Sequence, residues 1–267
     1  MAVLSVDLAF RRWSDVGIVV LDRPHPAPTS TAGNAARNPI ACHIIPSTAA
    51  GQSDGPIDAN ILAGRLNHLC ATRGIRLIML DGPQAWKSRT NGFEHARVSE
   101  RQLNTAAKTG LPGIVKPITY RPFAEFCLDV YDALCRRGWR RMDTSDRSAA
   151  SPNARLDRVL VESYPYAAWK SLGLPPLPSK RRAKVSDLAC AYSALRSLVP
   201  FTTDRPPNHD QLQAIVAGLP GLALDERNSA AVRIVGNPPR REDGHWREGF
   251  IVLPLPPHPP VELHWLD

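Results

Sequence analysis

The sequence has few cysteines, and none of them are paired at the spacing of a metal or redox motif. Five occur in 267 residues, mostly in apolar stretches, and no Cys-x-x-Cys is present. Zinc ribbons and disulfide-rich secreted domains depend on closely spaced cysteines, so the pattern argues against both classes. We therefore expect free thiols, most of them buried, in a protein of the reducing cytoplasm. They are Cys42, Cys70, Cys127, Cys135 and Cys190.

The sequence also lacks long apolar runs and several common catalytic motifs. No stretch is apolar enough to span a bilayer, and the first apolar run has no basic residues before it, so we expect no membrane partner. Gly-x-Ser-x-Gly, a P-loop and Gly-x-Gly-x-x-Gly are absent, and the eight histidines include no His-Glu-x-x-His. These absences argue against α/β-hydrolase, nucleotide-switch and dinucleotide-dependent chemistry.

Acidic residues are outnumbered by basic ones. The chain has 25 Asp and Glu against 33 Lys and Arg, which gives a net charge of +8. The corresponding isoelectric point is about 9.6. Such a balance favours an anionic partner, and nucleic acid, either DNA or RNA, is the partner we expect. The alternative is a basic protein without a polyanionic ligand.

Three of the apolar runs end on a carboxylate. AVLSVDL contains Asp7, RLIMLDGP contains Asp81 and RVLVESYP contains Glu162. Each run has the length and β-branched content of a buried strand. A charge at the end of such a strand is unfavourable to bury unless it is paired or binds a metal ion. The ends of parallel strands meet at one edge of a sheet, where α/β folds place their ligand sites, so we expect the three carboxylates to lie together.

The remaining pattern predicts one α/β domain. The spacing of the first two predicted strands suits an antiparallel hairpin, and helices alternate with the later strands. The predicted strands cover 2–7, 16–21, 41–47, 76–81 and 158–162, and the predicted helices cover 56–73, 122–137, 164–172, 180–198 and 210–219. A polar loop at about 82–120 is inserted in this domain of residues 1–225, with some helix near 97–107, and a surface loop is expected over 23–39. Residues 226–267 form a Pro-rich extension packed on the same domain, in which any strand lies at an edge or ends quickly.

The order of elements and motifs resembles a known family. VDLA, LDGP, ARVSERQLN and VESYPYAAWKSLG follow one another along the chain, and a lysine-rich helix start and a helix led by Asp210 come next. Together they resemble the domain of unknown function 429 family, whose members are predicted nucleases with a ribonuclease H-like fold. The resemblance implies a mixed five-stranded sheet, with an antiparallel meander followed by two parallel strands and flanking helices. The resemblance covers most of residues 2–224.

The resemblance implies a two-metal nuclease that hydrolyses phosphodiester bonds with Mg²⁺ or Mn²⁺. Asp7 would bridge the two cations, Asp81 and Glu162 would flank them, and Asp210 would supply a fourth carboxylate from a helix. Carboxylates are the ligands that Mg²⁺ prefers, and two cations roughly 4 Å apart can neutralise the phosphate and activate water.

Each carboxylate has a simpler explanation that the sequence leaves open. Asp7 could pair with Arg11 or Arg12, and Asp81 could stabilise its own Asp-Gly-Pro turn. Asp210 could interact only with the dipole of its helix. Glu162 is the hardest to explain this way, because glutamate is unfavourable in a buried strand.

Basic residues near these motifs are candidate substrate contacts. Arg97 and Arg101 are four residues apart and share a helix face, which suits a phosphate contact, although a solvated face would show the same spacing. Lys180 and Lys184 form a second such pair. The resemblance places a lysine at Lys184, where it would assist the leaving group, and Lys180 would bind substrate. His209, next to Asp210, is a candidate general base.

Two rival functions share this fold. One is a catalytically inactive nucleic-acid-binding module that keeps the basic surface. The other is a phosphotransferase of the actin-like or sugar-kinase type. The second is disfavoured because Asp7 is followed by LAFRRW, which offers no glycine to let the backbone approach a phosphate.

Overall fold

The first three strands form the antiparallel meander that the sequence predicts. The computed structural model describes residues 1–23, 38–48, 54–147 and 156–256. Strand β1 (Ala2–Asp7) pairs along its whole length with β2 (Gly17–Asp22), and β3 (Ile40–Ile45) pairs with the other side of β2. The surface loop expected over 23–39 falls almost entirely outside the described residues.

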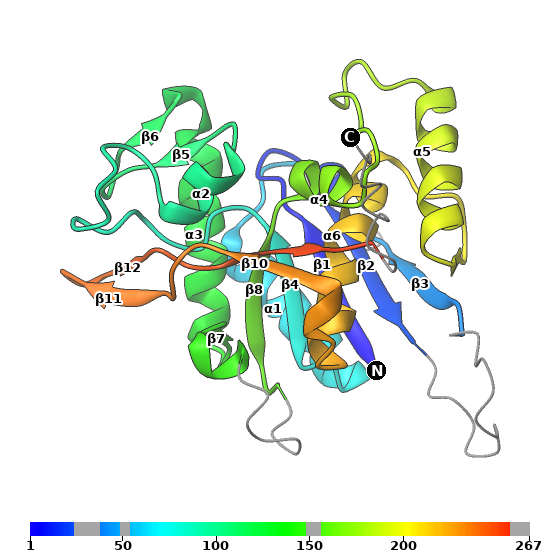
Figure 1. Ribbon diagram of the computed structural model, residues 1–267, viewed down its shortest axis with the longest axis horizontal. Coiled ribbons are helices and arrows are strands. Elements are labelled where there is room, and N and C mark those ends of the chain that lie inside the picture. The colour runs from blue at the N-terminus through cyan, green and yellow to red at the C-terminus, as the bar shows by residue number, and fades with distance from the viewer. Residues whose placement is uncertain (24–37, 49–53, 148–155, 257–267) are drawn as a thin grey trace, which may run out of the picture.

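Two parallel strands complete the predicted core of the sheet. Strand β4 (Leu77–Asp81) lies beside β1, and β8 (Val159–Ser163) lies beside β4. Helix α1 (Ala59–Arg73) connects β3 to β4, and α3 (Arg121–Cys135) lies on the way from β4 to β8 (Figure 1). The resulting order β3-β2-β1-β4-β8, antiparallel and then parallel, is the ribonuclease H-like arrangement that we expected.

The sheet is wider than predicted, with nine strands among the described residues. β9 (Phe201–Thr203) extends it beyond β3, while β13 (Ile251–Pro254) and β10 (Val232–Val235) extend it beyond β8, and β7 (Arg140–Arg141) pairs with the start of β8. The sequence predicts that a C-terminal strand lies at an edge or ends quickly, and the second alternative holds, because β13 lies between β10 and β8 but has only four residues. Pro254 is the last residue of β13, so its missing N–H ends the strand without interrupting the ladder.

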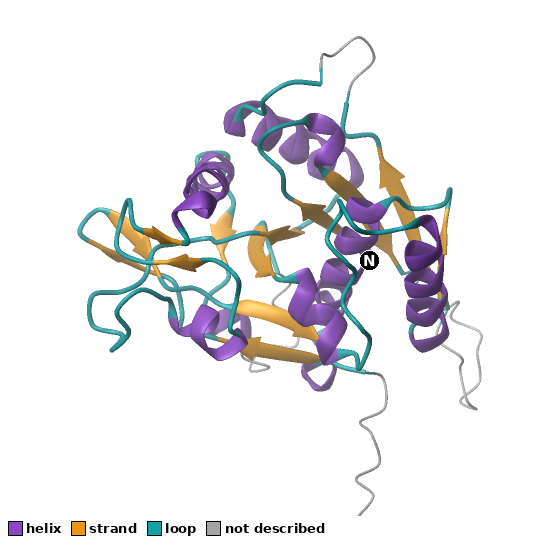
Figure 2. Cartoon of the chain, turned by 90° about the horizontal axis from the view of Figure 1, so that it is seen from above, coloured by secondary structure: helices purple, strands orange, loops and turns teal. Residues whose placement is uncertain are grey.

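Helices cover both faces of the sheet (Figure 2). Helices α4 (Pro165–Ser171), α5 (Val185–Leu198) and α6 (His209–Asp225) pack on the face that carries Val3 and Met79. Helices α1 and α3 pack on the opposite face, which carries Leu4 and Leu80. Successive strand residues point to opposite faces, so one run of apolar residues supplies both cores.

Three helix boundaries differ from the sequence prediction. Helix α1 is capped by Asp58, which accepts hydrogen bonds from two backbone N–H groups, whereas Asp54 binds Ser14 instead. Helix α5 begins after Lys184, so residues 180–184 lie in the preceding turn. Helix α6 continues through Pro220 to Asp225, because its buried face stays packed on the sheet beyond the proline.

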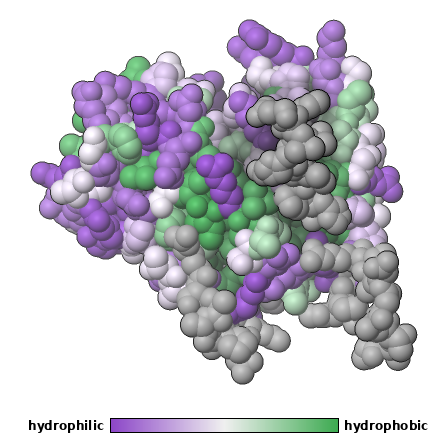
Figure 3. Space-filling view, viewed as in Figure 1, coloured by the Kyte–Doolittle hydropathy of each residue, from purple (hydrophilic) through white to green (hydrophobic). Residues whose placement is uncertain are grey.

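The segment inserted after β4 contains short regular elements. Helix α2 (Val98–Leu103) is followed by the small hairpin of β5 (Lys108–Thr109) and β6 (Val115–Lys116). A second hairpin, which pairs β11 (Arg240–Glu242) with β12 (His245–Arg247), comes from the C-terminal part of the chain, between β10 and β13. Hydrophilic side chains gather on this side of the molecule (Figure 3). Four 3-10 turns complete the described structure, at Trp13–Asp15, Ile118–Tyr120, Thr144–Arg147 and Ser229–Ala231.

The burial of the cysteines agrees with expectation in part. All five cysteines are free thiols, and Cys42, Cys70 and Cys127 are buried, but Cys135 is half-buried and Cys190 is exposed. Among the described helices, none combines the length and the apolar composition needed to cross a bilayer.

Candidate functional site: a carboxylate pair at the sheet edge

Asp7 and Asp81 lie side by side where β1 and β4 end. The two residues are direct partners in the parallel register, so their side chains leave the same face of the sheet. The two carboxyl groups are hydrogen-bonded to each other. The sequence predicts that three strand-end carboxylates lie together, and the structure brings two of them, Asp7 and Asp81, side by side.

The two carboxyl groups perturb each other's titration. Loss of hydration raises the pKa of Asp7 well above its usual range, and the negative charges of Asp81 and Asp210 raise it further. Loss of hydration is also the main reason that the pKa of Asp81 rises to about 7. A pair of this kind holds a proton or a cation near neutral pH, because two adjacent carboxylates repel each other when both are ionised.

Asp210 approaches the pair from the first turn of α6. Its charge contributes to the raised pKa of Asp7, which places it beside the pair. The first turn of α6 lies directly against the start of β2, where a Cβ on Gly17 would overlap the backbone carbonyl of Asp210. The absence of a side chain at Gly17 thus lets the helix bring Asp210 to the sheet edge.

Basic side chains hold Asp210 in place. The ammonium group of Lys180 donates to Asp210, and it also donates to Asp15 Oδ1 at 2.6 Å. The ring of His209 spans Asp210 and the loop before α5, with Nδ1 at 3.1 Å from Asp210 Oδ1 and Nε2 at 3.0 Å from the carbonyl of Pro178. Both ring nitrogens of His209 are therefore engaged in contacts that orient the carboxylate.

Glu162 does not join the pair, because it points to the opposite face of the sheet. In the β4–β8 register, Glu162 is opposite Leu80, and Ser163 is opposite Asp81. Ser163 therefore lies where a third strand-end carboxylate was expected. The sequence placed Glu162 at the correct edge, but one residue out of phase with Asp7 and Asp81.

The carboxylate of Glu162 forms a buried ion pair with Arg97. Arg97 Nη1 and Nη2 donate to the two Glu162 oxygens at 2.6 Å each, and the backbone N–H of Gln84 donates to Oε2 at 3.1 Å. The two charged side chains are 4% and 1% exposed, so this is an internal bidentate pair. Burial nevertheless raises the pKa of Glu162, with Arg97 opposing the shift.

Arg97 is consequently not on the solvent-facing helix surface that the spacing to Arg101 suggested. It precedes α2 as its N-terminal cap residue, and its guanidinium also binds Glu100 and Thr109 at 3.0 Å. Arg101, in the last turn of α2, is exposed. The two arginines therefore do not form a shared phosphate-binding face.

The two predicted lysines also have separate positions. Lys180 reaches the carboxylates, as described above, whereas Lys184 is an exposed residue at the start of α5 whose backbone N–H binds Asp187. They do not share a helix face, because α5 begins only at Val185.

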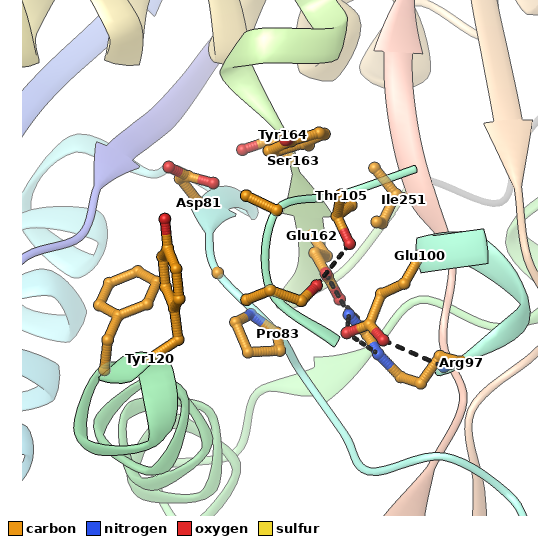
Figure 4. A pocket seen from close by; sticks show the side chains of 14 residues that line it. Asp81, Pro83, Arg97, Glu100, Thr105, Tyr120, Glu162, Ser163, Tyr164 and Ile251 are labelled. Atoms are coloured by element: carbon orange, nitrogen blue, oxygen red, sulfur yellow. Dashed lines mark hydrogen bonds and ion pairs between the residues drawn. The ribbon is translucent and has the colours of Figure 1, made fainter. Parts of the chain in front are cut away.

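A pocket of about 220 Å³ opens between Asp81 and the Arg97–Glu162 pair (Figure 4). The sequence interpretation did not single out several side chains that line it, among them Ser163, Tyr120 and Tyr164. Alternation along β8 puts Ser163 and Glu162 on opposite faces, but it does not say which of the two shares the face of Asp81, and only the register of β8 against β4 decides this. No sequence signal identifies Tyr120, which the inserted segment brings to the site.

The carboxylates are the type of ligand that a hard divalent cation prefers, but they are not arranged as a complete binding site. Within the described ranges, no three Asp, Glu, His or Cys side chains are spaced to hold a metal ion together. Asp7 and Asp81 are nevertheless oxygen donors that share a hydrogen bond and resist simultaneous ionisation, and a bound cation would remove that repulsion. Asp7 and Asp81 could hold Mg²⁺ or Mn²⁺, and Asp210 would join them once it is released from Lys180.

Comparison with known proteins gives structural likeness only. No family model and no curated protein sequence matches the chain, so the resemblance to the domain of unknown function 429 family stays a prediction. Among solved structures, Thermus thermophilus RuvC is similar with a TM-score of 0.38 and 10% identity, over 89% of this chain and 99% of that chain. T. thermophilus RuvC in complex with a Holliday junction substrate is similar with a TM-score of 0.35 and 11% identity, over 88% and 98%. Likeness at this level carries no argument about activity, and the fold assignment rests on the strand order of the sheet.

Proposed function

We propose that this protein is a metal-dependent nuclease that hydrolyses phosphodiester bonds of DNA or RNA in the cytoplasm. The observation that supports the proposal is the paired ends of β1 and β4, where Asp7 and Asp81 share a hydrogen bond and have raised pKa values in a chain of net charge +8. Strand-end carboxylates of this kind bind hard cations, and the basic balance favours a polyanionic substrate. Membership of the domain of unknown function 429 family is part of the same proposal.

Three carboxylates are assigned as cation ligands at the site. A divalent cation, when bound, would supply charge neutralisation at the phosphate and an activated water. Asp7 and Asp81 would hold that cation, and Asp210 would supply a further oxygen ligand in place of its contact with Lys180. Lys180, exposed and next to Arg181 and Arg182, is then available to contact the substrate backbone.

Glu162 and Arg97 are assigned to the scaffold of the site. All the charged atoms of this pair are satisfied within the protein, and the pair joins β8 to the inserted segment. Lys184 and Arg101 are assigned to the basic surface that contacts the backbone of the substrate, because both are exposed.

The test is cleavage of labelled single-stranded and duplex DNA and RNA by the whole chain, with Mg²⁺, with Mn²⁺ and with a chelator. We expect cation-dependent cleavage that Asp7→Asn reduces by at least about 100-fold, because the substitution removes the charge but keeps the shape of the side chain. Asp129→Asn is the matched control, since Asp129 is an exposed carboxylate of α3. Cleavage by a folded Asp7→Asn variant at the parental rate would contradict the proposal.

One observation favours the inactive binding module as the second candidate. Lys180 neutralises Asp210 internally, and the described residues hold no ready-made group of three metal ligands. A protein of that type would bind nucleic acid without cleaving it, and added Mg²⁺ would not raise its melting temperature. Thermal melts with and without Mg²⁺ therefore separate the two candidates independently of any substrate.

A further inference from the structure

The pocket beside Asp81 has walls suited to a flat ring. Tyr120 lies on one side of it, and Thr105 and Ile251 lie on the other (Figure 4). Phe123 also lines the pocket. Its volume of about 220 Å³ is below the usual range of pockets for drug-sized ligands, roughly 300–1,000 Å³, and is suited to a single small ring system. An aromatic wall facing an aliphatic one is the arrangement in which enzymes hold an extruded base.

The charges around the pocket select against a phosphate. Three carboxylates line it, from Asp81, Glu100 and Glu162, and within the described ranges Arg97 is the only cationic side chain that lines it. Both ends of that guanidinium are already used, on Glu100 and on Glu162. An anionic group would therefore meet uncompensated negative charge, whereas an uncharged ring would not.

A polar group in the wall of the pocket lacks a hydrogen-bond partner among the described residues. Ser163 is 2% exposed, and its hydroxyl makes no hydrogen bond within the part of the chain that the structure describes. Buried hydroxyl groups are almost always hydrogen-bonded, so this one calls for an explanation, and a ligand with ring nitrogens or carbonyl oxygens would provide one. Ser163 lies opposite Asp81 in the sheet, so the same ligand would sit next to the carboxylate pair.

Hydrogen bonds hold the wall of the pocket that Tyr164 and Thr105 form. The Tyr164 hydroxyl accepts a hydrogen bond from the backbone N–H of Ala106, which joins the end of β8 to the loop between α2 and β5. Thr105 Oγ1 donates to the carbonyl of Ala107 at 2.6 Å within that loop. The pocket is thus built by two segments that are far apart in the sequence and are held together by hydrogen bonds.

We propose that this pocket binds one unpaired nucleobase, so that the substrate is a single strand or a duplex with a locally unpaired nucleotide. The inference rests on the proposed function, since it names the form of nucleic acid that would be presented to Asp7 and Asp81. The ring stacks on Tyr120, its polar edge meets Ser163, and the adjoining phosphate stays outside the pocket beside the carboxylate pair.

The test compares two labelled single strands of about 12 nucleotides, oligothymidylate and an abasic strand with the same phosphates but no bases, by fluorescence anisotropy in chelator. We expect the parental protein to bind oligothymidylate about tenfold more tightly than the abasic strand, and Tyr120→Leu to abolish that preference without changing abasic affinity. Tyr120→Phe should retain it. Phe93→Leu is the matched control, because Phe93 has a similar exposure of 37% against 40% and does not line the pocket.

Equal affinity of the parental protein for the two strands would overturn the inference, and so would a Tyr120→Leu protein that keeps the preference for bases. These results are distinct from failure of the proposed function. A protein that prefers bases but cleaves nothing with Mg²⁺ contradicts the nuclease alone. A protein that cleaves nucleic acid but ignores the bases contradicts the pocket alone.

Discussion

Glu162 and Ser163 are neighbours in sequence whose side chains leave opposite faces of one sheet. Ser163 is level with Asp81, and Glu162 is level with Leu80. A shift of one residue on a strand therefore decides whether a carboxylate lies beside Asp7 or points to the opposite face of the sheet and pairs with Arg97. Each of these groups has a different expected response to substitution.

Replacing Glu162 by Gln should destabilise the fold. The change leaves the guanidinium of Arg97 buried next to a neutral amide, and breaking a buried pair in this way costs about 3–5 kcal/mol of the free energy of unfolding. Urea denaturation measures the change. Glu125→Gln is the control, because its i,i+4 pair with Arg121 is exposed and should contribute less than about 0.5 kcal/mol. An undiminished free energy of unfolding together with lost cleavage would assign Glu162 to catalysis instead.

Replacing Asp81 by Asn should stabilise the metal-free protein above neutral pH. The pKa of Asp81 rises from 3.8 to about 7, so between these values the folded state holds a proton that the unfolded chain has released. The free energy of unfolding of the parental protein therefore falls as the pH rises from about 4 to about 7, and Asp81→Asn removes this loss. Denaturation in chelator across pH 5–8 should show the advantage of the variant growing with pH.

Asp54→Asn should lower the free energy of unfolding at neutral pH, and this loss should disappear as the pH falls, which is the opposite of the effect of Asp81→Asn. Hydrogen bonds from Ser14 lower the pKa of Asp54, so its stabilising contribution is present at neutral pH and is lost as the pH falls through that lowered pKa.

Added Mg²⁺ should raise the stability of the parental protein and leave that of the Asp81→Asn variant unchanged. An advantage of Asp81→Asn that is independent of pH would contradict the proposed titration.

At the scale of elements, the contact between β2 and the start of α6 sets the position of Asp210. The backbone of α6 lies so close to Gly17 that any side chain there would meet the carbonyl of Asp210. Helix α6 also packs along β1 and β2 through Leu212, Ile215 and Val216. The helix therefore has little room to move away without opening the core.

Gly17→Ala should lower the free energy of unfolding by about 1–3 kcal/mol and weaken Mg²⁺ binding, because the added methyl group displaces the first turn of α6. Gly64→Ala is the matched control, since Gly64 lies within α1 and a methyl group there meets only the end of Arg137, at 3.8 Å. That control should stabilise the protein by about 0.5–1 kcal/mol. Thermal melts and Mg²⁺ titrations measure the two effects, and equal behaviour of the two variants would contradict the role of Gly17.

At the scale of the whole molecule, the net charge of +8 makes the position of the basic side chains relative to the site important for binding a polyanion. Arg181 and Arg182 are exposed in the turn next to Lys180, close to the carboxylates. Arg73 and Arg76 are exposed just before β4, at the end of that strand opposite Asp81. The basic residues near the site should therefore matter more for binding than those at the far end of the sheet.

Nucleic-acid affinity should fall steeply with salt, with a log–log slope of about −0.7 for each phosphate contacted on a single strand. The double variant Arg181→Glu with Arg182→Glu should weaken binding and make this slope less steep, by the amount expected for the loss of about one to two phosphate contacts. Arg73→Glu with Arg76→Glu, which makes the same change in net charge at the far end, should alter the slope much less. Equal losses in the two double variants would show a general charge effect, and an affinity independent of salt would exclude a polyanionic partner.

The sequence by itself determined the parts of the structure that depend on local patterning. Apolar periodicity located the five core strands and their helices, and the order of these elements led to the ribonuclease H-like sheet. Strand-end position placed Asp7 and Asp81 at one edge, because neighbouring parallel strands end together. These features depend on residues close in the chain and on rules that hold for any sheet.

Only the tertiary structure decided the features that depend on register and on distant segments. The phase of β8 against β4 sends Glu162 away from the pair, and the length of that strand alone does not specify it. The partner of Glu162, Arg97, is 65 residues away, and Lys180 is 30 residues from Asp210. Strand β13 lies inside the sheet, between β10 and β8, and its proline is compatible with this place because Pro254 is the last residue of the strand. Local sequence specifies which elements form, whereas the packing of the whole chain decides which side chains meet.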